Sequence, residues 1–390
     1  MVETLRPRES GEVERAVSWA AAEEKQLEII GAGSKRGVGQ PTQNDMTLDL
    51  SSLKGITLYE PEELVLSARA GTRLSDIEDA LRERGQELAF EPADWGPLFG
   101  LAPGIATLGG VIAANLSGPR RIKAGAARDH FLGVTAISGR GELFKAGGRV
   151  VKNVTGYDLC KVLAGSWGTL AVMTDITVKV LPAAESELSI VVRGADDQSA
   201  CRAMSAAMGS PCDVSAAAHL PGRFTVLRLE GFGPSIAARA ADLKKRLAPF
   251  GDIGQLDQNA SRALWREVRD VTPFAADSSR PLWRISTAPA QGYKVIDRLK
   301  DRLDMAHFYD WAGGLIWLEL AGGEVHADLV RGALQGLSGH ATLLRADAPS
   351  RAAACVFQPQ PAGLAALSAR VKKGFDPKGV LNAGRMATGQ

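Results

Sequence analysis

Hydrophobic and polar residues alternate with two different periods along residues 1–182. Residues 12–24 and 74–84 place apolar side chains at helical spacing, and Ser75 and Gly85 are the expected N-cap and stop signal of the second helix. Short apolar runs between turn residues predict buried strands. These runs lie at 27–30, 47–50, 64–68, 132–138 and 170–182. The pattern predicts a first domain of mixed helices and strands that ends at Pro182.

The pattern restarts after Pro182 and predicts a second domain at 183–350. A strand-like run at 187–193 precedes a helical pattern at 198–208, and a second run at 224–230 precedes a helical pattern at 235–250. A further strand is expected at 315–320 and a further helix at 326–336. Two strand–helix–strand passes with little glycine are typical of an α+β domain. The closing segment, 351–390, is expected to contain one helix followed by the turn-rich stretch "FDPKGVLNAGRM".

The composition excludes several classes of protein. The 390 residues are 45% hydrophobic with a formal net charge of +2, and the basic stretch "PRRIK" at 119–123 is short and lacks interleaved aromatic residues, so no nucleic-acid partner is expected. A transmembrane helix would need about 18 uninterrupted apolar residues, and no such run is present. The N-terminus is charged from its third residue and does not read as a secretory signal. These features predict a cytoplasmic protein.

The four cysteines are scattered along the chain, at Cys160, Cys201, Cys212 and Cys355. Their spacing matches neither a Cys-x-x-Cys motif nor a zinc site. They cannot supply the clustered ligands of an iron–sulfur centre. We expect reduced, buried thiols.

A glycine-rich stretch, "IIGAGSKRGVG" at 29–39, follows the first buried strand. Its glycines and Ser34 offer backbone N–H groups and a hydroxyl in a tight turn, which is one way to hold phosphate. It is not a dinucleotide fingerprint, because the third glycine is misplaced and no helix follows, and it lacks the Gly-Lys-Ser/Thr of a P-loop. An ordinary glycine-rich turn is the competing interpretation.

The stretch "TLGGVIAANLSG" at 107–118 is apolar yet crowded with glycine and alanine. A core helix is disfavoured, because glycine costs up to about 1 kcal/mol relative to alanine, so Gly109 and Gly110 indicate a turn. Ala113 and Ala114 would let a ligand lie close to the chain. Polar groups come from Thr107, Asn115 and Ser117. The stretch is typical of a segment that wraps an extended ligand, and a tightly self-packed turn is the alternative.

A third segment, 151–182, runs from a loop through a short helix into a strand. Gly156, Gly165 and Gly168 punctuate it. Lys152 and Asp158 are expected to form a structural ion pair.

In this order, the three segments together with "ARDHFLGV" at 127–134 and "FDPKGVLNAGRM" at 375–386 resemble the FAD-binding fold of the vanillyl-alcohol oxidase and p-cresol methylhydroxylase type. Within that fold the chain is similar to the FAD-binding subunits of bacterial glycolate oxidase, which are relatives of the D-lactate dehydrogenases. The resemblance extends more weakly to "LWRIS" at 282–286 and "DWAGGLIWLEL" at 310–320. It implies an α+β fold with a two-part FAD-binding domain, formed by 1–182 and 351–390, and an α+β cap domain.

The resemblance implies FAD as the cofactor and gives roles to particular residues. The first loop would hold the diphosphate, the second would lie along flavin and diphosphate, the third would approach the adenine through its backbone, and the closing segment would return towards the flavin. The residues implied for the first loop are Gly31, Ala32, Gly33, Ser34 and Lys35. Those implied for the second are Thr107, Gly109, Gly110, Ala113, Asn115, Ser117 and Gly118. The third segment would contribute Gly168 and Val172, and the closing segment Asn382. Asn382 is followed by Ala383, where the common family form has proline.

Two departures from the family pattern bear on the chemistry. Some relatives attach FAD through a histidine in the first loop, but residues 31–36 read "GAGSKR", so non-covalent FAD is implied. Relatives that dehydrogenate 2-hydroxy acids carry clustered histidines that hold a metal. In this chain only His326, beside Glu324, resembles these clustered histidines, and one such pair supplies too few ligands for a metal site. We expect no metal, and no catalytic residue is assigned.

The resemblance implies an FAD-binding subunit of a glycolate oxidase complex, which oxidises glycolate to glyoxylate. A catalytic FAD subunit of the D-lactate dehydrogenase type and an iron–sulfur subunit would be its partners, and any association with a membrane would come through them. One alternative is an autonomous FAD-dependent 2-hydroxy-acid dehydrogenase, with Arg36, Trp283, Arg284 and His326 as candidate substrate residues. Another is an FAD-binding assembly subunit without turnover.

Overall fold

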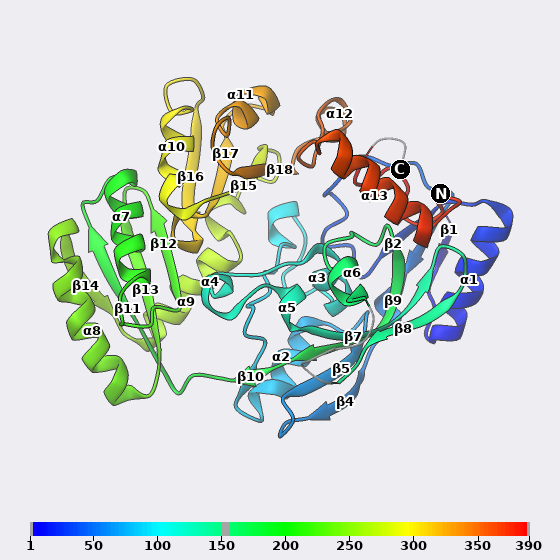
Figure 1. Cartoon of the computed structure of the whole chain (residues 1–390), viewed down its shortest axis with the longest axis horizontal. Helices are drawn as coiled ribbons and strands as arrows, with labels where there is room; N and C mark the ends of the chain where they lie inside the picture. Colours follow the sequence, from blue (N-terminus) through cyan, green and yellow to red (C-terminus); the bar gives the residue numbers. More distant parts are fainter. Residues whose placement is uncertain (1–2, 150–156, 388–390) are drawn as a thin grey trace. The chain divides into compact units, whose positions relative to one another are not determined.

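The structure, a computed structural model, describes residues 3–149 and 157–387. The chain forms two compact units (Figure 1). The first comprises Met1–Leu116, Ala126–Pro182 and Pro359–Gln390, and the second comprises Ser117–Gly125 and Ala183–Gln358. The blue and red ends of the chain in Figure 1 thus belong to one unit. The domain boundaries expected at 182 and 350 stay a prediction.

A parallel sheet and helix α1 (Ser10–Glu23) open the first unit. The sheet has the order β1–β3–β2, with β1 at Glu3–Leu5, β2 at Leu27–Ile30 and β3 at Met46–Asp49. Helix α1 buries Val13, Val17 and Ala20, which are spaced three to four residues apart and therefore share one face, against a core that includes Leu27. Strand β2 ends at Ile30, where the glycine-rich loop begins.

A five-stranded antiparallel sheet completes the first unit, with the order β4–β5–β9–β7–β8. Its strands are β4 (Ile56–Glu60), β5 (Val65–Arg69), β7 (Phe131–Ser138), β8 (Leu143–Gly147) and β9 (Ala171–Lys179). Around it lie α2 (Leu74–Arg82), α3 (Leu108–Ala114), α5 (Ala127–His130), α6 (Leu159–Leu163), and the short strands β6 (Gln86–Glu87) and β10 (Leu181–Pro182). Helix α3 packs on β5 and β9, which brings residues 108–114 to this sheet.

Helix α13 (Ala362–Phe375) returns the chain to β2. A buried ion pair joins Lys372 to Asp376 at 2.6 Å, and the same ammonium donates to the carbonyl oxygens of Thr169 at 2.7 Å and Leu381 at 3.0 Å. The Asp376 carboxylate accepts a hydrogen bond from the Leu381 N–H at 2.9 Å. Leu381 forms a parallel bridge with Leu27 of β2. These contacts fix the closing segment beside β2 and the turn that precedes β9.

The second unit is built on an eight-stranded antiparallel sheet with the order β14–β11–β13–β12–β16–β17–β15–β18. The strands are β11 (Ser186–Arg193), β12 (Ala216–Leu220), β13 (Phe224–Gly231), β14 (Asp252–Leu256), β15 (Leu282–Thr287), β16 (Met305–Asp310), β17 (Leu315–Leu320) and β18 (Gly339–Arg345). The helices are α4 (Arg121–Ala124), α7 (Asp197–Met208), α8 (Gly233–Leu247), α9 (Gln258–Arg269), α10 (Gly292–Asp297), α11 (Ala327–Gly332) and α12 (Ala348–Ala353).

The two faces of this sheet differ in character. One face carries Trp283 and Ile285 of β15 and packs with α7, α8, α10 and α11 in one apolar core. Side chains alternate along a strand, so Arg284 lies on the other face.

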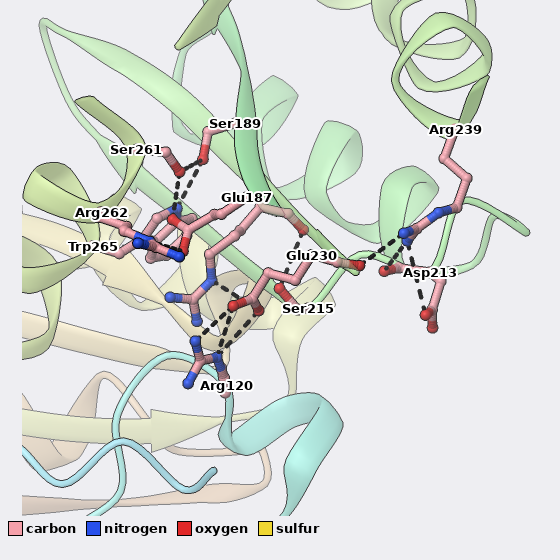
Figure 2. A network of polar contacts seen from close by, with 11 residues as sticks. Arg120, Glu187, Ser189, Asp213, Ser215, Glu230, Arg239, Ser261, Arg262 and Trp265 are labelled. Atoms are coloured by element: carbon pink, nitrogen blue, oxygen red, sulfur yellow. Dashed lines mark hydrogen bonds and ion pairs between the residues drawn. The ribbon is translucent and has the colours of Figure 1, made fainter. Parts of the chain in front are cut away.

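On that other face, a buried polar network joins α9 to β11 and β13 (Figure 2). Ser261 donates to Glu187 at 2.6 Å and lies 2.7 Å from Ser189, which accepts from the Trp265 indole at 2.8 Å. Burial raises the pKa of Glu187. The guanidinium of Arg228 stacks on the Trp265 ring at 4.7 Å. Helix α9 therefore covers this end of the second face.

The mixture of helices and strands confirms the expected α+β class, but two local predictions are wrong. Residues 108–114 form a short helix rather than a turn, capped by the Thr107 hydroxyl, which accepts from the Gly110 N–H at 3.3 Å. Ser75 lies inside α2, which begins after Arg73 without a side-chain cap.

The remaining expectations concern isolated residues. Lys152 and Gly156 lie outside the described residues, so the expected ion pair between Lys152 and Asp158 stays a prediction. Asp158 caps α6 by accepting from the Lys161 N–H at 3.2 Å. The first three cysteines are buried as expected, whereas Cys355 is exposed. Within 3–149 and 157–387, no helix is long and apolar enough to span a membrane.

Candidate functional site: a recess at the glycine-rich loop

The first unit contains a recess of about 670 Å³, counted with the space at its open mouth. The end of β2, the glycine-rich loop, the start of α3, the turn before β9 and the closing segment form its walls. The predicted site residues that line it are Gly31, Ala32, Gly33, Ser34, Lys35, Thr107, Gly109, Gly110, Ala113 and Gly168. Three segments far apart in the sequence are thus brought together as the motifs indicate.

The glycine-rich loop presents free backbone donors. The N–H groups of Ala32, Gly33 and Ser34 make no hydrogen bond within the part of the chain that the structure describes. Gly33 has φ +77°, in the left-handed region that glycine adopts without a steric penalty. Successive N–H groups in such a turn form a concave site suited to an anion.

A buried lysine adds positive charge to the same loop. Lys35 is 7% exposed, and its ammonium donates to the Ser34 hydroxyl at 3.0 Å. Burial lowers the pKa of Lys35 to about 8; Asp94 opposes this shift and the charge of Arg385 adds to it. An ammonium with three donors thus has capacity left for an anionic ligand.

The loop and the 107–118 stretch approach each other closely at Gly31 and Thr107. A Cβ atom at Gly31 would lie 2.3 Å from the Thr107 hydroxyl oxygen, so only glycine fits there. Gly109 meets a second close approach, because its N–H donates to the Ala70 carbonyl at 2.8 Å and a Cβ would lie 2.8 Å from the Ala70 side chain. The self-packing interpretation therefore holds for Gly109, whereas a Cβ at Gly110 would face the Lys35 side chain at 3.4 Å.

The closing segment supports the recess from behind. Asn382 is 2% exposed; its side-chain oxygen accepts from the Ile29 N–H at 2.8 Å, and its amide nitrogen donates to the Trp167 carbonyl at 2.8 Å. Arg385 stacks on the Trp167 ring at 5.4 Å and donates to the Lys35 carbonyl at 2.7 Å. Asn382 thus positions β2 and the Trp167 turn without lining the recess itself.

Four further predicted residues lie elsewhere. Asn115 ends α3 in the left-handed conformation, and its side-chain oxygen accepts from the Arg128 N–H at 3.0 Å. Val172 is fully buried in the core beneath α1. Ser117 and Gly118 belong to the second unit. A direct role of these residues in binding a cofactor stays a prediction.

The recess also contains residues that sequence reasoning missed as binding residues. These are chiefly Trp167, Met173 and Arg385; Arg36, expected only as a candidate substrate residue, lines the recess as well. Arg385 had a signal, because it follows the Asn-Ala-Gly motif by one position, and Trp167 lies between two of the glycines noted above. Arg36 pairs with Glu28 of β2, which holds its guanidinium at the rim.

A second recess, of about 1320 Å³ counted with open space, shares Ala32 and Thr107 with the first. Its other lining residues include three cations, Arg8, Lys54 and Arg73, and one carboxylate, Asp76. The two recesses therefore suit an extended ligand with an anionic centre. FAD has this form, and the free N–H groups and the Lys35 ammonium fit its diphosphate.

Replacing Gly31 with alanine is expected to lower FAD affinity and to destabilise the chain by about 1–3 kcal/mol, because the new methyl group overlaps Thr107. FAD titration and urea unfolding measure the two effects. In a Thr107→Ala background the added cost of the Gly31 substitution is expected to shrink. Gly363→Ala, at an open helical position, serves as the control and is expected not to destabilise. Equal costs with and without Thr107 would contradict the steric explanation.

Comparison with known proteins agrees with this site. Residues 3–147 match the family model described as FAD binding domain, which confirms FAD as the cofactor expected from the sequence. The solved structure of an alkyldihydroxyacetonephosphate synthase superposes with a TM-score of 0.68 at 15% identity, covering 97% of this chain and 75% of that one. This likeness confirms the expected fold.

Relatives with assigned names share a large part of the chain. Glycolate oxidase subunit GlcD of Bacillus subtilis (strain 168) is 24% identical over 76% of this chain and 62% of its own length, and a D-lactate dehydrogenase of Anaerostipes hadrus is 31% identical over 43% of this chain and 34% of its own. Glycolate oxidase subunit GlcE of Escherichia coli (strain K12) is 33% identical over 370 residues, which are 95% of either chain. The chain therefore belongs to the family of the glycolate oxidase subunit GlcE.

Proposed function

We propose that this chain is the FAD-carrying subunit of a glycolate oxidase complex. Its FAD takes part in electron transfer, while a flavoprotein subunit of the D-lactate dehydrogenase type oxidises glycolate to glyoxylate and an iron–sulfur subunit accepts the electrons. The observation that carries the proposal is the cationic recess with free N–H donors, in a chain that matches a glycolate oxidase subunit along almost its whole length.

The residues of the recess divide the work of holding the cofactor. When bound, FAD supplies the ring system that accepts and passes on electrons. The N–H groups after β2 and the Lys35 ammonium bind the diphosphate, and the cations of the second recess add positive potential along the rest of the ligand. The residues 31–36 contain no histidine, so the cofactor is held without a covalent bond.

The alternative of an autonomous dehydrogenase requires its candidate substrate residues to meet. Trp283 donates to the Val325 carbonyl at 2.9 Å inside the helix-covered core, on the face opposite Arg284. His326 begins α11 beside Glu324, and Arg36 is paired with Glu28 in the first unit. Neither Trp283 nor His326 joins Arg284 in one site, which favours substrate oxidation by the partner flavoprotein.

The anaerobic visible spectrum of the purified chain, before and after glycolate, tests this proposal. We expect a flavin spectrum that glycolate leaves unchanged in the isolated chain and bleaches in the co-purified complex. Bleaching of the isolated chain would establish an autonomous dehydrogenase. A complex that turns over with the flavin of this chain permanently oxidised would establish the assembly role.

FAD affinity is expected to fall as the pH rises from 7 to 9.5. Lys35 has a pKa of about 8 before the ligand binds, so its ammonium is lost through this range and the diphosphate loses a charge-assisted partner. Fluorescence titration of FAD at each pH measures the change. In Lys35→Met the slope of affinity against pH is expected to be shallower. A wild-type affinity that is constant to pH 9.5 would contradict the role of Lys35.

A further inference from the structure

The second unit carries a cluster of cations that the proposed FAD recess does not use. It lies on the sheet face away from α7, α8, α10 and α11. Arg284 of β15 lies directly across from Trp317 of β17 on one side and from Thr342 of β18 on the other. Residues that face each other across antiparallel strands share one face of the sheet, so this face presents a cation beside an indole.

The segment Ser117–Gly125 lies over the same face and is held in place at several points. Arg120 forms a bidentate pair with Glu230 of β13, at 2.6 Å and 3.1 Å (Figure 2). The Trp311 indole donates to the Gly118 carbonyl at 3.0 Å, and Lys123 pairs with Asp213. A bidentate, largely buried arginine–carboxylate pair fixes orientation as well as distance, so the residue after Arg120 has a defined position.

That residue, Arg121, converges with Arg284 on one aromatic ring. The guanidinium carbon of Arg121 lies 4.3 Å from the Trp311 ring centroid, and that of Arg284 lies 5.0 Å from it. The Arg284 guanidinium forms no hydrogen bond or ion pair with the residues that the structure describes. Stacking on indole leaves the N–H edge of the Arg284 guanidinium available for a planar anion.

The electrostatics of the cluster favour an added anion. Burial and the charge of Arg121 lower the pKa of Arg284 to about 10, and the charge of Asp310 opposes this shift. Burial and the charges of Arg284 and Arg121 lower the pKa of His340, which favours its neutral imidazole. An anion between the two guanidiniums relieves their mutual repulsion, and a neutral imidazole remains as a hydrogen-bonding group.

We propose that Arg121, Arg284 and Trp311 bind the carboxylate of a small 2-hydroxy or 2-oxo acid. Guanidinium forks match a carboxylate in a bidentate way, and the buried indole provides an apolar floor for a short carbon chain. Glycolate and glyoxylate belong to this class, so the inference rests on the proposed function. It adds that the FAD-carrying subunit itself holds a small acid.

Calorimetric titration of the FAD-loaded chain with glycolate, glycolamide and inorganic phosphate tests the site. Glycolamide has the size of glycolate without its charge. We expect glycolate to bind, glycolamide to bind at least 10-fold more weakly, and phosphate to bind more weakly than glycolate. Arg284→Gln and Arg121→Gln are each expected to weaken glycolate binding 10-fold or more, because each removes a charge-assisted contact.

Arg223→Gln is the matched control, because Arg223 also stacks on an aromatic ring, that of Phe224 at 5.2 Å, within the same unit. It is expected to leave glycolate binding unchanged. Arg121 is exposed, so its variant tests the site even where the Arg284 variant fails to fold. The proposal would be overturned if the wild-type chain bound no glycolate or if the Arg284 and Arg121 variants bound glycolate normally. It would also be overturned if phosphate bound as tightly as glycolate. The FAD content of the same samples reads out the proposed function separately.

Discussion

Replacing Lys35 with methionine is expected to weaken FAD binding roughly 10- to 100-fold, the loss of one or two charge-assisted hydrogen bonds. Lys35 is buried at the wall of the recess, and its ammonium has Ser34 as its hydrogen-bond partner. Methionine keeps the apolar stem and removes the charge. Equilibrium titration of the apo chain with FAD measures the effect.

The stability of the Lys35→Met chain separates a binding role from a structural one. Burial makes the charged form of Lys35 unfavourable in the absence of a ligand, as its lowered pKa shows. The apo variant is therefore expected to unfold at the same temperature as the wild type or a higher one. Lys25→Met, at an exposed lysine beside Asp45, is the control and should change neither quantity. A variant that binds FAD like the wild type would remove Lys35 from the site.

Replacing Asp376 with alanine is expected to lower the free energy of unfolding by about 3–5 kcal/mol. The substitution leaves the Lys372 ammonium buried without its carboxylate, which is 2.6 Å away in the native chain. It also removes the acceptor for the Leu381 N–H, beside the residue that holds β2 and the Trp167 turn together. Denaturant unfolding measures the loss, and FAD affinity is expected to fall with it.

The matched control for Asp376 is an ion pair that joins the same closing segment to α1 at the surface. Lys378 lies 3.3 Å from Glu24, and the two side chains are 45% and 72% exposed. Glu24→Ala is expected to cost less than about 1 kcal/mol, because solvent screens exposed pairs. Similar costs for the two substitutions would show that the closing segment does not depend on its buried pair.

The helices and strands of the first unit were largely predictable, because each has a clear period and a turn residue at its end. Helix α1 and strands β2, β3 and β5 follow this rule. Strand β12, "AAAHL", was not predictable in this way, because it lacks the β-branched residues that mark a strand. It forms through its pairing with β13. The antiparallel order of the eight-stranded sheet is likewise set by contacts between distant segments.

In the candidate site too, some features were predictable from the sequence and others were not. Backbone features, such as the glycines of the first loop, leave a signature in the sequence. Contacts between side chains of distant segments do not, so the stacking of Arg385 on Trp167 and the burial of Lys35 became visible only in the fold. The helical start of the 107–118 stretch was mispredicted because the packing of Gly109 on Ala70 overrides the intrinsic cost of glycine in a helix.

The most direct test of the account is the flavin content of the purified chain after it has been supplied with FAD. Absorbance of the native protein gives the amount bound, and acid precipitation shows whether the flavin is released. We predict close to one FAD for each chain, all of it released by acid. A folded chain without flavin would contradict the assignment of the recess, and flavin that stays with the precipitated protein would contradict non-covalent binding.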